Sequence, residues 1–472
     1  MNGKKIRLRL VPKTKTDISI SRTFGNKPVR SAKDFKPAKS KAKEALRRTL
    51  NTGVDAKLTK NNCITVELNA DQLKDIFQAT ATPVKGKRLG RSFTFQESHV
   101  SSKTQIKLPK EIEEVVEFAY LPSSPEFFAP SFVAPNISRF HLDLDDVLRR
   151  LNGSRCHRQG WTGRNIRVAM TDTGFAKHPY FESHSYDIQR ISTDQTSQPE
   201  IDDSGHGTGE SANVLALAPD CQFIGVKHDD YSALALETAL EANPHVITNS
   251  WGWNIDQMTK QELQIQNPNL YFELTDLENI ILDAIDDGVV IVFAAGNGHF
   301  AFPGSIPDVI SVGGASVDIR GKLEASNYAS SFISSLYPNR KVPDFCGIVG
   351  RSGTPPLKGH IMLPVPNGCE LEGENMPRNK SKLGWGIFSG TSAASPQIAG
   401  CIALLLSVNP NLTPMQIKTI LSDTTIDVVN GTTAHGVDAE SGRDLATGAG
   451  FVDVFAACIM AQNRCRSNTI ER

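Results

Sequence analysis

Four short motifs carry the residue types that acyl transfer requires. A serine hydroxyl is a weak nucleophile until a histidine removes its proton, and a carboxylate can hold that histidine in the productive tautomer. An asparagine amide can stabilise the negative oxygen of the transition state. We therefore expect Asp172 to orient His206, and His206 to deprotonate Ser392. Asn297 would bind the oxyanion. In chain order, the motifs are Asp172-Thr173-Gly174, Gly205-His206-Gly207-Thr208, Ala294-Ala295-Gly296-Asn297 and Gly390-Thr391-Ser392.

The surrounding sequence predicts the element that positions each of these residues. Apolar runs end at Asp172 and just before Asn297, as at the carboxyl ends of buried strands, where α/β folds collect their chemistry. His206 lies in a glycine-rich turn that opens an apolar helix, and Ser392 directly precedes a second one, at the positive end of the helix dipole. Taken singly, each residue has a structural explanation as a loop cap, surface histidine, turn asparagine or helix cap. Their combination favours the chemical role.

The order Asp, His, Ser along the chain is that of the subtilisin-like serine peptidases. Residues 145–460 resemble this family beyond the four motifs. The resemblance implies a serine endopeptidase that works through an acyl-enzyme, on a subtilisin-like three-layer α/β/α fold with a mainly parallel sheet. The further similar blocks are Arg167 to Thr171, His178-Pro179, Ala218-Pro219, Asn249 to Gly252, Val309 to Gly313 and Gly448 to Asp453.

Beside the expected reacting atoms, the sequence departs from this family. A second histidine often follows the threonine of the family's histidine motif, whereas Gly209-Glu210 stands there in this chain. The family's serine motif is Gly-Thr-Ser-Met-Ala-Ala-Pro, so Ala393 and Ser395 also differ. We expect these departures to leave the base and the nucleophile intact and to change the packing around them.

The resemblance also implies how a substrate binds. An extended peptide would pair its backbone with an edge segment made of Ser250, Trp251 and Gly252, with Ala294, Ala295 and Gly296 on the opposite side. These residues are uncharged, so we expect a preference for an apolar or uncharged residue before the cleaved bond. The indole of Trp251 is equally compatible with a place in the core.

No cofactor is expected, and the cysteine and histidine spacings show no metal motif. The acidic pairs Asp202-Asp203 and Asp229-Asp230 are conceivable calcium ligands, but paired acids at a surface turn are usually only solvated.

Charge is divided very unevenly along the chain. Residues 1–110 carry 26 Lys and Arg against 8 Asp and Glu, a net charge of +18. Because the whole chain has 51 of each, the remainder carries 25 against 43, a net charge of −18. The two parts should attract each other. A basic arm is also typical of nucleic-acid binding, but since an intramolecular partner is available we expect none from that class.

These patterns predict four segments: a basic N-terminal domain (1–120), a Pro/Ser-rich linker (121–144), a catalytic domain (145–462) and a tail (463–472). In the first segment, residues 6–10 predict an exposed or half-buried strand, and residues 42–50 a helix. A strand over 63–68, a helix over 70–78 with Asn69 as cap, and a strand over 114–120 follow. This small α+β unit resembles the propeptides that precede subtilisin-like peptidases. The resemblance implies an inhibitory domain, which would be released by a cut in the linker.

Composition also bears on the compartment. Eight cysteines lie at 63, 156, 221, 346, 369, 401, 458 and 465 without CxxC pairs, and we expect buried thiols, with a disulfide as the alternative. Because no apolar segment follows the basic start, we expect no secretory signal, and because no run of about 18 apolar residues occurs, we expect no membrane span. We therefore expect a cytoplasmic protein that does not enter the membrane.

Two other functions remain open from the sequence. An acyl-enzyme resolved by an amine instead of water would make the protein a peptide ligase or macrocyclase. A catalytically idle module whose basic arm binds nucleic acid is the alternative from another class, and the complete triad argues against it.

Overall fold

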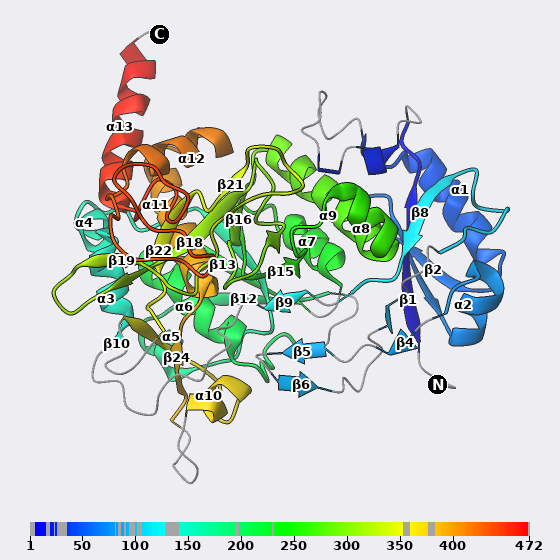
Figure 1. Cartoon of the computed structure of the whole chain (residues 1–472), viewed down its shortest axis with the longest axis horizontal. Helices are drawn as coiled ribbons and strands as arrows, with labels where there is room; N and C mark the ends of the chain where they lie inside the picture. Colours follow the sequence, from blue (N-terminus) through cyan, green and yellow to red (C-terminus); the bar gives the residue numbers. More distant parts are fainter. Residues whose placement is uncertain are drawn as a thin grey trace.

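The structure is a computed structural model with two recognisable parts. Figure 1 shows a large α/β part in the centre and on the left, and a small sheet with two helices on the right. Only the backbone is described for residues 82–101, 126–127 and 465–470 within the ranges that follow. The structure describes residues 5–15, 19–22, 24–25, 35–80, 82–83, 86–88, 91–93, 100–101, 106–123, 125–127, 141–193, 198–228, 231–352, 359–375 and 383–470.

An eight-stranded sheet forms the centre of the large part. Its inner strands are mostly short apolar runs, which suit a parallel sheet that is buried on both faces. The order is β12-β13-β11-β14-β16-β18-β19, and β22 also pairs with β18. All pairings are parallel except that of β19 with β18. The strands are β11 (Arg167–Asp172), β12 (Ile188–Ser192), β13 (Gln222–Lys227), β14 (Val246–Asn249), β16 (Val290–Ala294), β18 (Ile310–Val317), β19 (Leu323–Ala325) and β22 (Phe345–Ile348).

Helices cover both faces of this sheet, because alternate residues of each strand point to opposite sides. In β11, Val168 and Met170 join one hydrophobic cluster, and Ala169 joins the other. The predicted three-layer α/β/α fold is therefore confirmed. One layer contains α3 (Leu144–Arg150), α4 (Gly153–Arg158), α6 (His206–Leu217), α11 (Thr391–Val408), α12 (Pro414–Asp423) and α13 (Val454–Ile470), and the other contains α7 (Ser232–Glu241), α8 (Lys260–Gln266) and α9 (Pro268–Asp286).

The small part is an antiparallel sheet of order β2-β3-β1-β8 with a hydrophobic cluster of its own. Asn69 caps the second helix in a reciprocal capping box with Gln72, at the position that the sequence predicts. The strand β2 was not predicted, because it has only four residues and none of them is fully buried. The elements are β1 (Ile6–Pro12), α1 (Lys39–Leu50), β2 (Asp55–Leu58), β3 (Ile64–Leu68), α2 (Ala70–Phe77) and β8 (Val116–Tyr120).

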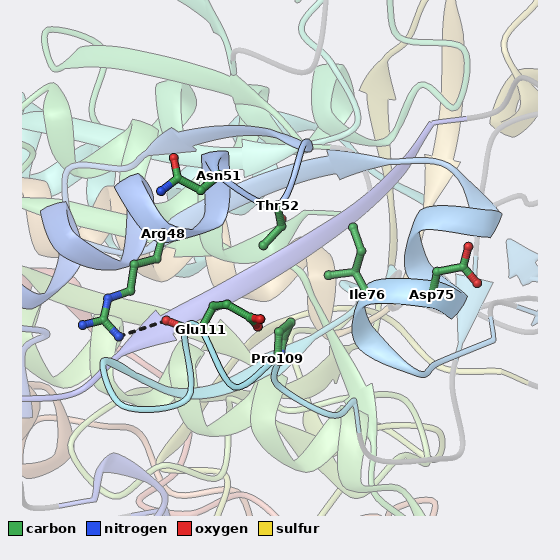
Figure 2. Close-up of a pocket in the computed structure, with 7 residues that line it drawn as sticks. All are labelled: Arg48, Asn51, Thr52, Asp75, Ile76, Pro109 and Glu111. Atoms are coloured by element: carbon green, nitrogen blue, oxygen red, sulfur yellow. Dashed lines mark hydrogen bonds between the residues drawn. The ribbon is translucent and has the colours of Figure 1, made fainter.

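A cavity of about 580 Å³ opens on this small part. It lies between the end of α1, the helix α2 and the segment before β8, and Arg48 donates to the carbonyl of Glu111 at its rim (Figure 2). None of the candidate site residues lines it. Its lining residues are Arg48, Asn51, Thr52, Asp75, Ile76, Pro109 and Glu111.

The prediction that residues 6–10 form an exposed or half-buried strand is wrong in its burial. β1 is almost entirely buried, and Arg9 is 0 % exposed. The reason is that the sheet's second face packs on the large part, where α7 and α9 present Glu237 and Asp276 to the guanidinium. A charged residue can be buried in this way only when carboxylates neutralise it.

Shorter elements complete the described chain. Most of the predicted linker, residues 128–140, lies outside the described residues, but β9 (Glu126–Phe127) belongs to a small sheet of order β17-β15-β9 with β15 (Trp251–Asn254) and β17 (Ala301–Phe302). The others are η1 (Ile20–Arg22), β4 (Thr82–Pro83), β5 (Gly86–Arg88), β6 (Arg91–Phe93), β7 (Val100–Ser101), β10 (His141–Leu142), α5 (Pro179–Ser183), β20 (Phe332–Ile333), β21 (Lys341–Val342), β23 (His360–Pro364), α10 (Glu370–Asn375) and β24 (Trp385–Phe388).

The structure bears on two expectations drawn from composition, those for a membrane span and for the cysteines. Within the described part of the chain, one helix, α11, is long and apolar enough to cross a membrane, but 89 % of it is buried inside the protein. A core helix passes the same test, so this is weak evidence for a span. Seven of the eight cysteines are buried free thiols, as predicted, while the side chain of Cys465 lies outside the described residues.

Candidate active site

The expected base and its orienting acid meet at the carboxyl edge of the central sheet. Asp172 is the last residue of β11 and His206 the first of α6. Their Oδ1 and Nδ1 atoms are 2.8 Å apart, and the carboxylate also accepts from the amide of Thr173 at 2.8 Å. Both side chains are buried, so this hydrogen bond is shielded from water. A Cβ on Gly207 would lie 2.4 Å from the carbonyl oxygen of Gly174, which shows how closely α6 approaches the strand end.

Asp202 anchors the turn that leads to His206. Its carboxylate accepts from the hydroxyl of Thr173 at 2.7 Å, the amide of Gly205 at 2.9 Å, and the amide and hydroxyl of Thr208 at 2.9 and 2.7 Å. Burial raises its pKa, against these hydrogen bonds. The expectation of a solvated acid is therefore wrong for Asp202, because its side chain is buried and both oxygens are held by protein donors.

The structure says little about the other acidic residues considered as calcium ligands. Asp203 is exposed, and Asp229-Asp230 lie outside the described residues. In the part of the chain that the structure describes, no group of three or more His, Cys, Asp or Glu side chains is arranged to hold a metal ion.

Ser392 is the second residue of α11, after Gly390 at the N-cap with a φ of 107°. Its hydroxyl lies 3.4 Å from the carbonyl oxygen of Ser250, and the Ser250 hydroxyl donates to the Ser392 carbonyl at 3.0 Å. Helices α11 and α6 pack against each other, so Ser392 and His206 lie at the first turns of neighbouring helices. Ser392 is 1 % exposed and His206 2 % exposed.

Asn297 follows β16 and is fixed by the first turn of α11. Its Oδ1 atom accepts from the amide of Thr391 at 2.9 Å and from the Thr391 hydroxyl at 3.2 Å. Because the oxygen is used in this way, the amide's NH₂ group must point to the other side. The same Thr391 hydroxyl accepts from the amide of Gly296 at 3.0 Å. Sequence reasoning gave Thr391 no role, although it stands next to the expected nucleophile.

The predicted substrate edge is already paired. Strand β9 of the linker runs antiparallel to β15, with Phe127 opposite Trp251 and Glu126 opposite Gly252. The indole of Trp251 lies in the core, 0 % exposed, and donates to the hydroxyl of Thr171 at 2.8 Å. Only the backbone of Trp251 can therefore meet a peptide.

The residues predicted to lie on the opposite side of the substrate, Ala294, Ala295 and Gly296, are also buried. Ala294 packs with Ala301, and Ala295 packs with Phe332 and Val342. Gly296 is buried with a φ of 105° and is tied to Thr391. Ala294, Ala295 and Gly296 are uncharged, as the sequence shows. A pocket for a substrate side chain beside them stays a prediction.

Carboxylates surround His206 on both sides of its ring. Glu210, one turn further along α6, places Oε1 3.9 Å from Nε2 and is 0 % exposed. Burial alone would lower the pKa of His206, but the charges of Asp172, Glu210 and Asp202 outweigh it and raise the pKa to about 9. Burial raises the pKa of Glu210 to about 8. The sequence marked Glu210 only as a departure from the resembling family.

This arrangement has the parts that acyl transfer requires. A neutral His206 could accept a proton through Nε2 while Asp172 holds the opposite nitrogen. The hydroxyl of Ser392 stands at a helix N-terminus, and Asn297 is fixed beside the same turn. Such groups stabilise the charge of the transition state most strongly where water is excluded and the dielectric constant is low.

Comparison with known proteins finds related sequences. Fervidolysin from Fervidobacterium pennivorans is 26 % identical over 381 residues, which cover 70 % of this chain and 48 % of fervidolysin. Subtilisin amylosacchariticus from Bacillus subtilis subsp. amylosacchariticus is 24 % identical over 288 residues, or 59 % of this chain and 65 % of that relative. The chain thus spans about half to two thirds of the length of these curated relatives.

A solved structure gives the fold. The crystal structure of fervidolysin, described as a keratinolytic enzyme related to subtilisin, superposes with a TM-score of 0.58 at 17 % identity, covering 97 % of this chain and 62 % of that one. Residues 163–450 match the Subtilase family, and this range holds Asp172, His206, Asn297 and Ser392. The chain therefore belongs to the subtilase family and has a subtilisin-like fold.

Proposed function

We propose that the protein is a serine endopeptidase that cleaves peptide bonds through an acyl-enzyme. The observation that carries the proposal is the buried hydrogen bond of 2.8 Å between Asp172 and His206, at the edge where the Ser392 helix begins. Membership of the subtilase family supports the same reaction class.

In this mechanism, His206 accepts the proton of Ser392 as its oxygen attacks the carbonyl carbon of the substrate. Asn297 and the backbone N–H of Ser392 stabilise the oxyanion. His206 then gives the proton to the leaving amine, and the acyl-enzyme forms. In the second half of the reaction, water attacks the acyl-enzyme. His206 first takes a proton from the water as a base and then gives it to Ser392 as an acid. Asp172 stabilises the imidazolium in both halves and keeps its own negative charge.

The N-terminal part acts in this proposal as an inhibitory propeptide. Support comes from β9, which occupies the edge of β15 where an extended substrate would pair. The near-complete burial of Ser392 and His206, 1 % and 2 % exposed, agrees with a covered site. Ion pairs between the basic N-terminal part and the acidic helices α7 and α9 would hold the inhibitor in place.

The direction of β9 indicates where self-cleavage would occur. Because β9 is antiparallel to β15, its carboxyl end at Phe127 is directed toward the Ser250 end of β15. The carbonyl oxygen of Ser250 lies 3.4 Å from the Ser392 hydroxyl. The cleaved bond should therefore follow Phe127 by no more than a few residues.

The test compares the full-length protein with its Ser392→Ala variant. Wild type should shorten by itself, should yield a fragment that begins a few residues after Phe127, and should react with a fluorophosphonate probe. The variant should stay intact and unlabelled. Shortening of the purified variant would refute self-processing, and absence of labelling in both full-length and N-terminally trimmed wild type would refute the peptidase. Mass spectrometry of peptide products would show joined ends if a ligase is the true function.

For substrates and setting, the proposal is broader. Substrates would be proteins or peptides cut after an apolar or uncharged residue, which a cleavage profile on a peptide library would test. Seven buried free thiols support a reducing, cytoplasmic compartment. The basic N-terminal surface would serve the intramolecular contact, with no nucleic-acid partner.

A further inference from the structure

Glu210 is a buried acid that the proposed mechanism does not use. It is 0 % exposed, and its Oε2 accepts from the side-chain amide of Asn213 at 2.9 Å. Its Oε1 has no hydrogen-bond partner among the described residues and lies 3.9 Å from Nε2 of His206. A carboxyl group in an apolar surrounding is costly to ionise, and such groups persist mainly where a partner charge or a function requires them.

The local packing explains why an acid occupies this position. A Cβ on Gly209 would lie 2.2 Å from Cζ of Phe388, so a side chain as large as histidine has no room there. Position 210, one helical turn after His206, instead points its side chain along the same face of α6 as the imidazole. The two departures from the family motif are therefore linked: Gly209 leaves room for Phe388, and Glu210 places the acid near His206.

We propose that Glu210 is a positioning residue that holds the protonated imidazole of His206 from the Nε2 side and so sets the pH at which His206 becomes a base. The proposal rests on the proposed function and goes beyond it, since the reaction needs only the Asp172 side of the ring. His206 would then lie between two acids, with Asp172 at Nδ1 and Glu210 near Nε2.

The groups that act on Glu210 come from several elements. His206 lies on its own helix and Asp172 on β11, while Tyr328, on the segment after β19, is a group on which the charge of Glu210 acts. Tyr328 is itself tied to the Ser392 turn, because its hydroxyl accepts from the amide of Gly390 at 2.8 Å. Asp202, before α6, acts on His206 from the other side. Of these groups, Glu210 is the one whose removal leaves the Asp172 hydrogen bond and the Ser392 turn in place.

The sign of the effect follows from charge. His206 must be neutral to accept a proton, so activity is present above its pKa and is lost as pH falls through it. An ionised Glu210 favours the imidazolium and thus raises that pKa. Since Glu210 and His206 are within ion-pairing distance, they release protons as a pair, and the acid limb of the activity profile belongs to both. Removing the acid should move the limb to lower pH.

The experiment measures kcat/KM against pH for the processed wild type and for Glu210→Gln. The glutamine keeps the size and the contact with Asn213 but carries no charge. The acid limb should fall by about one pH unit, which makes the variant about tenfold more active below the limb. The plateau at high pH should change less. The rate of fluorophosphonate labelling, measured against pH without a peptide, should show the same shift.

Controls separate this role from a structural one. Glu210→Asp keeps an acid and should bring the limb back toward that of wild type, while Glu210→Leu should lower it as glutamine does. Glu440→Gln removes an exposed acid and should leave the profile unchanged. The inference is wrong if the limb of Glu210→Gln coincides with that of wild type, or if Glu440→Gln shifts it equally. A wild type that neither turns over nor labels would refute the proposed function instead.

Discussion

Arg9 donates from Nε to Oδ2 of Asp276 at 2.6 Å, across the contact between the N-terminal sheet and the large part of the molecule. The same guanidinium donates to Glu237 at 2.6 Å, and Tyr120 donates to Asp276 at 2.7 Å. All of these side chains are buried. At this contact, the opposite charges of the two parts form a buried network of ion pairs and hydrogen bonds with defined geometry.

Replacing Arg9 should loosen this contact strongly. Arg9→Met keeps much of the apolar volume but leaves Glu237 and Asp276 as unpaired carboxylates in the interior. Removing one member of a buried ion pair costs about 3–5 kcal/mol. We expect a loss of this size in the free energy of unfolding, measured by chemical denaturation of full-length protein that also carries Ser392→Ala.

Lys5 supplies the matched control on the same strand. Its ion pair with Glu67 is exposed, with 72 % of the lysine side chain accessible, so Lys5→Met should leave the denaturation midpoint unchanged. Equal midpoints for the Arg9 and Lys5 variants would show that the buried network does not hold the two parts together.

The expected triad residues could be predicted because each stands at the end of a strongly patterned element. The apolar run before Asp172 becomes a buried strand, and the apolar residues after His206 and Ser392 become helices. Local pattern and chain order were sufficient to place these residues at one edge of the sheet. The residues that hold them lack such a signal, and their roles come from tertiary contacts.

Asp202 illustrates what the sequence could not give. An acid in a turn with Asp, Ser and Gly neighbours is typical of a solvated loop, yet this carboxylate is buried and receives four hydrogen bonds. Arg9 likewise resembles an exposed strand residue until the partner helices are known. Arg9 depends on partners that are 228 and 267 positions away in the chain. Asp202 depends on Thr173 and on Gly205 and Thr208 in its own turn, and these contacts follow no helix or strand period.

Phe127→Pro should slow self-processing. Proline lacks an N–H donor and has a fixed φ, so it disturbs the pairing of β9 with β15. Full-length protein should persist longer in a time course followed by gel electrophoresis, while processed enzyme should turn over peptides at the wild-type rate. Phe127→Ala keeps the backbone donor and should be processed faster than the proline variant. Equal processing of wild type and Phe127→Pro would contradict the role given to β9.

Thr391→Val tests the link between the serine turn and Asn297. Valine keeps the shape but loses the hydroxyl that joins Gly296 and Asn297. Because the amide of Thr391 still holds Asn297, we expect kcat to fall only about tenfold. Asn297→Ala should lower kcat by about 10²–10³-fold, the usual effect of losing one oxyanion donor.

A double-mutant cycle checks whether Thr391 acts through Asn297. If it does, adding Thr391→Val to Asn297→Ala should cost little more, so that the two effects are not additive. Additive losses in kcat would assign Thr391 a separate role.

Gly207→Ala should damage the reaction more than the fold. The added Cβ would lie 2.4 Å from the carbonyl oxygen of Gly174 and 2.9 Å from Cβ of Asp172, so the start of α6 must move away from β11. The hydrogen bond of 2.8 Å between Asp172 and His206 would lengthen. Since a displacement of about 1 Å can cost about 10²-fold, we expect kcat/KM to fall by about that factor. Gly386→Ala is the milder control, because the nearest atom to its added Cβ, Cε2 of Phe388, would be 3.3 Å away. A Gly207→Ala enzyme as active as Gly386→Ala would show that the close approach of α6 to the strand end does not position His206.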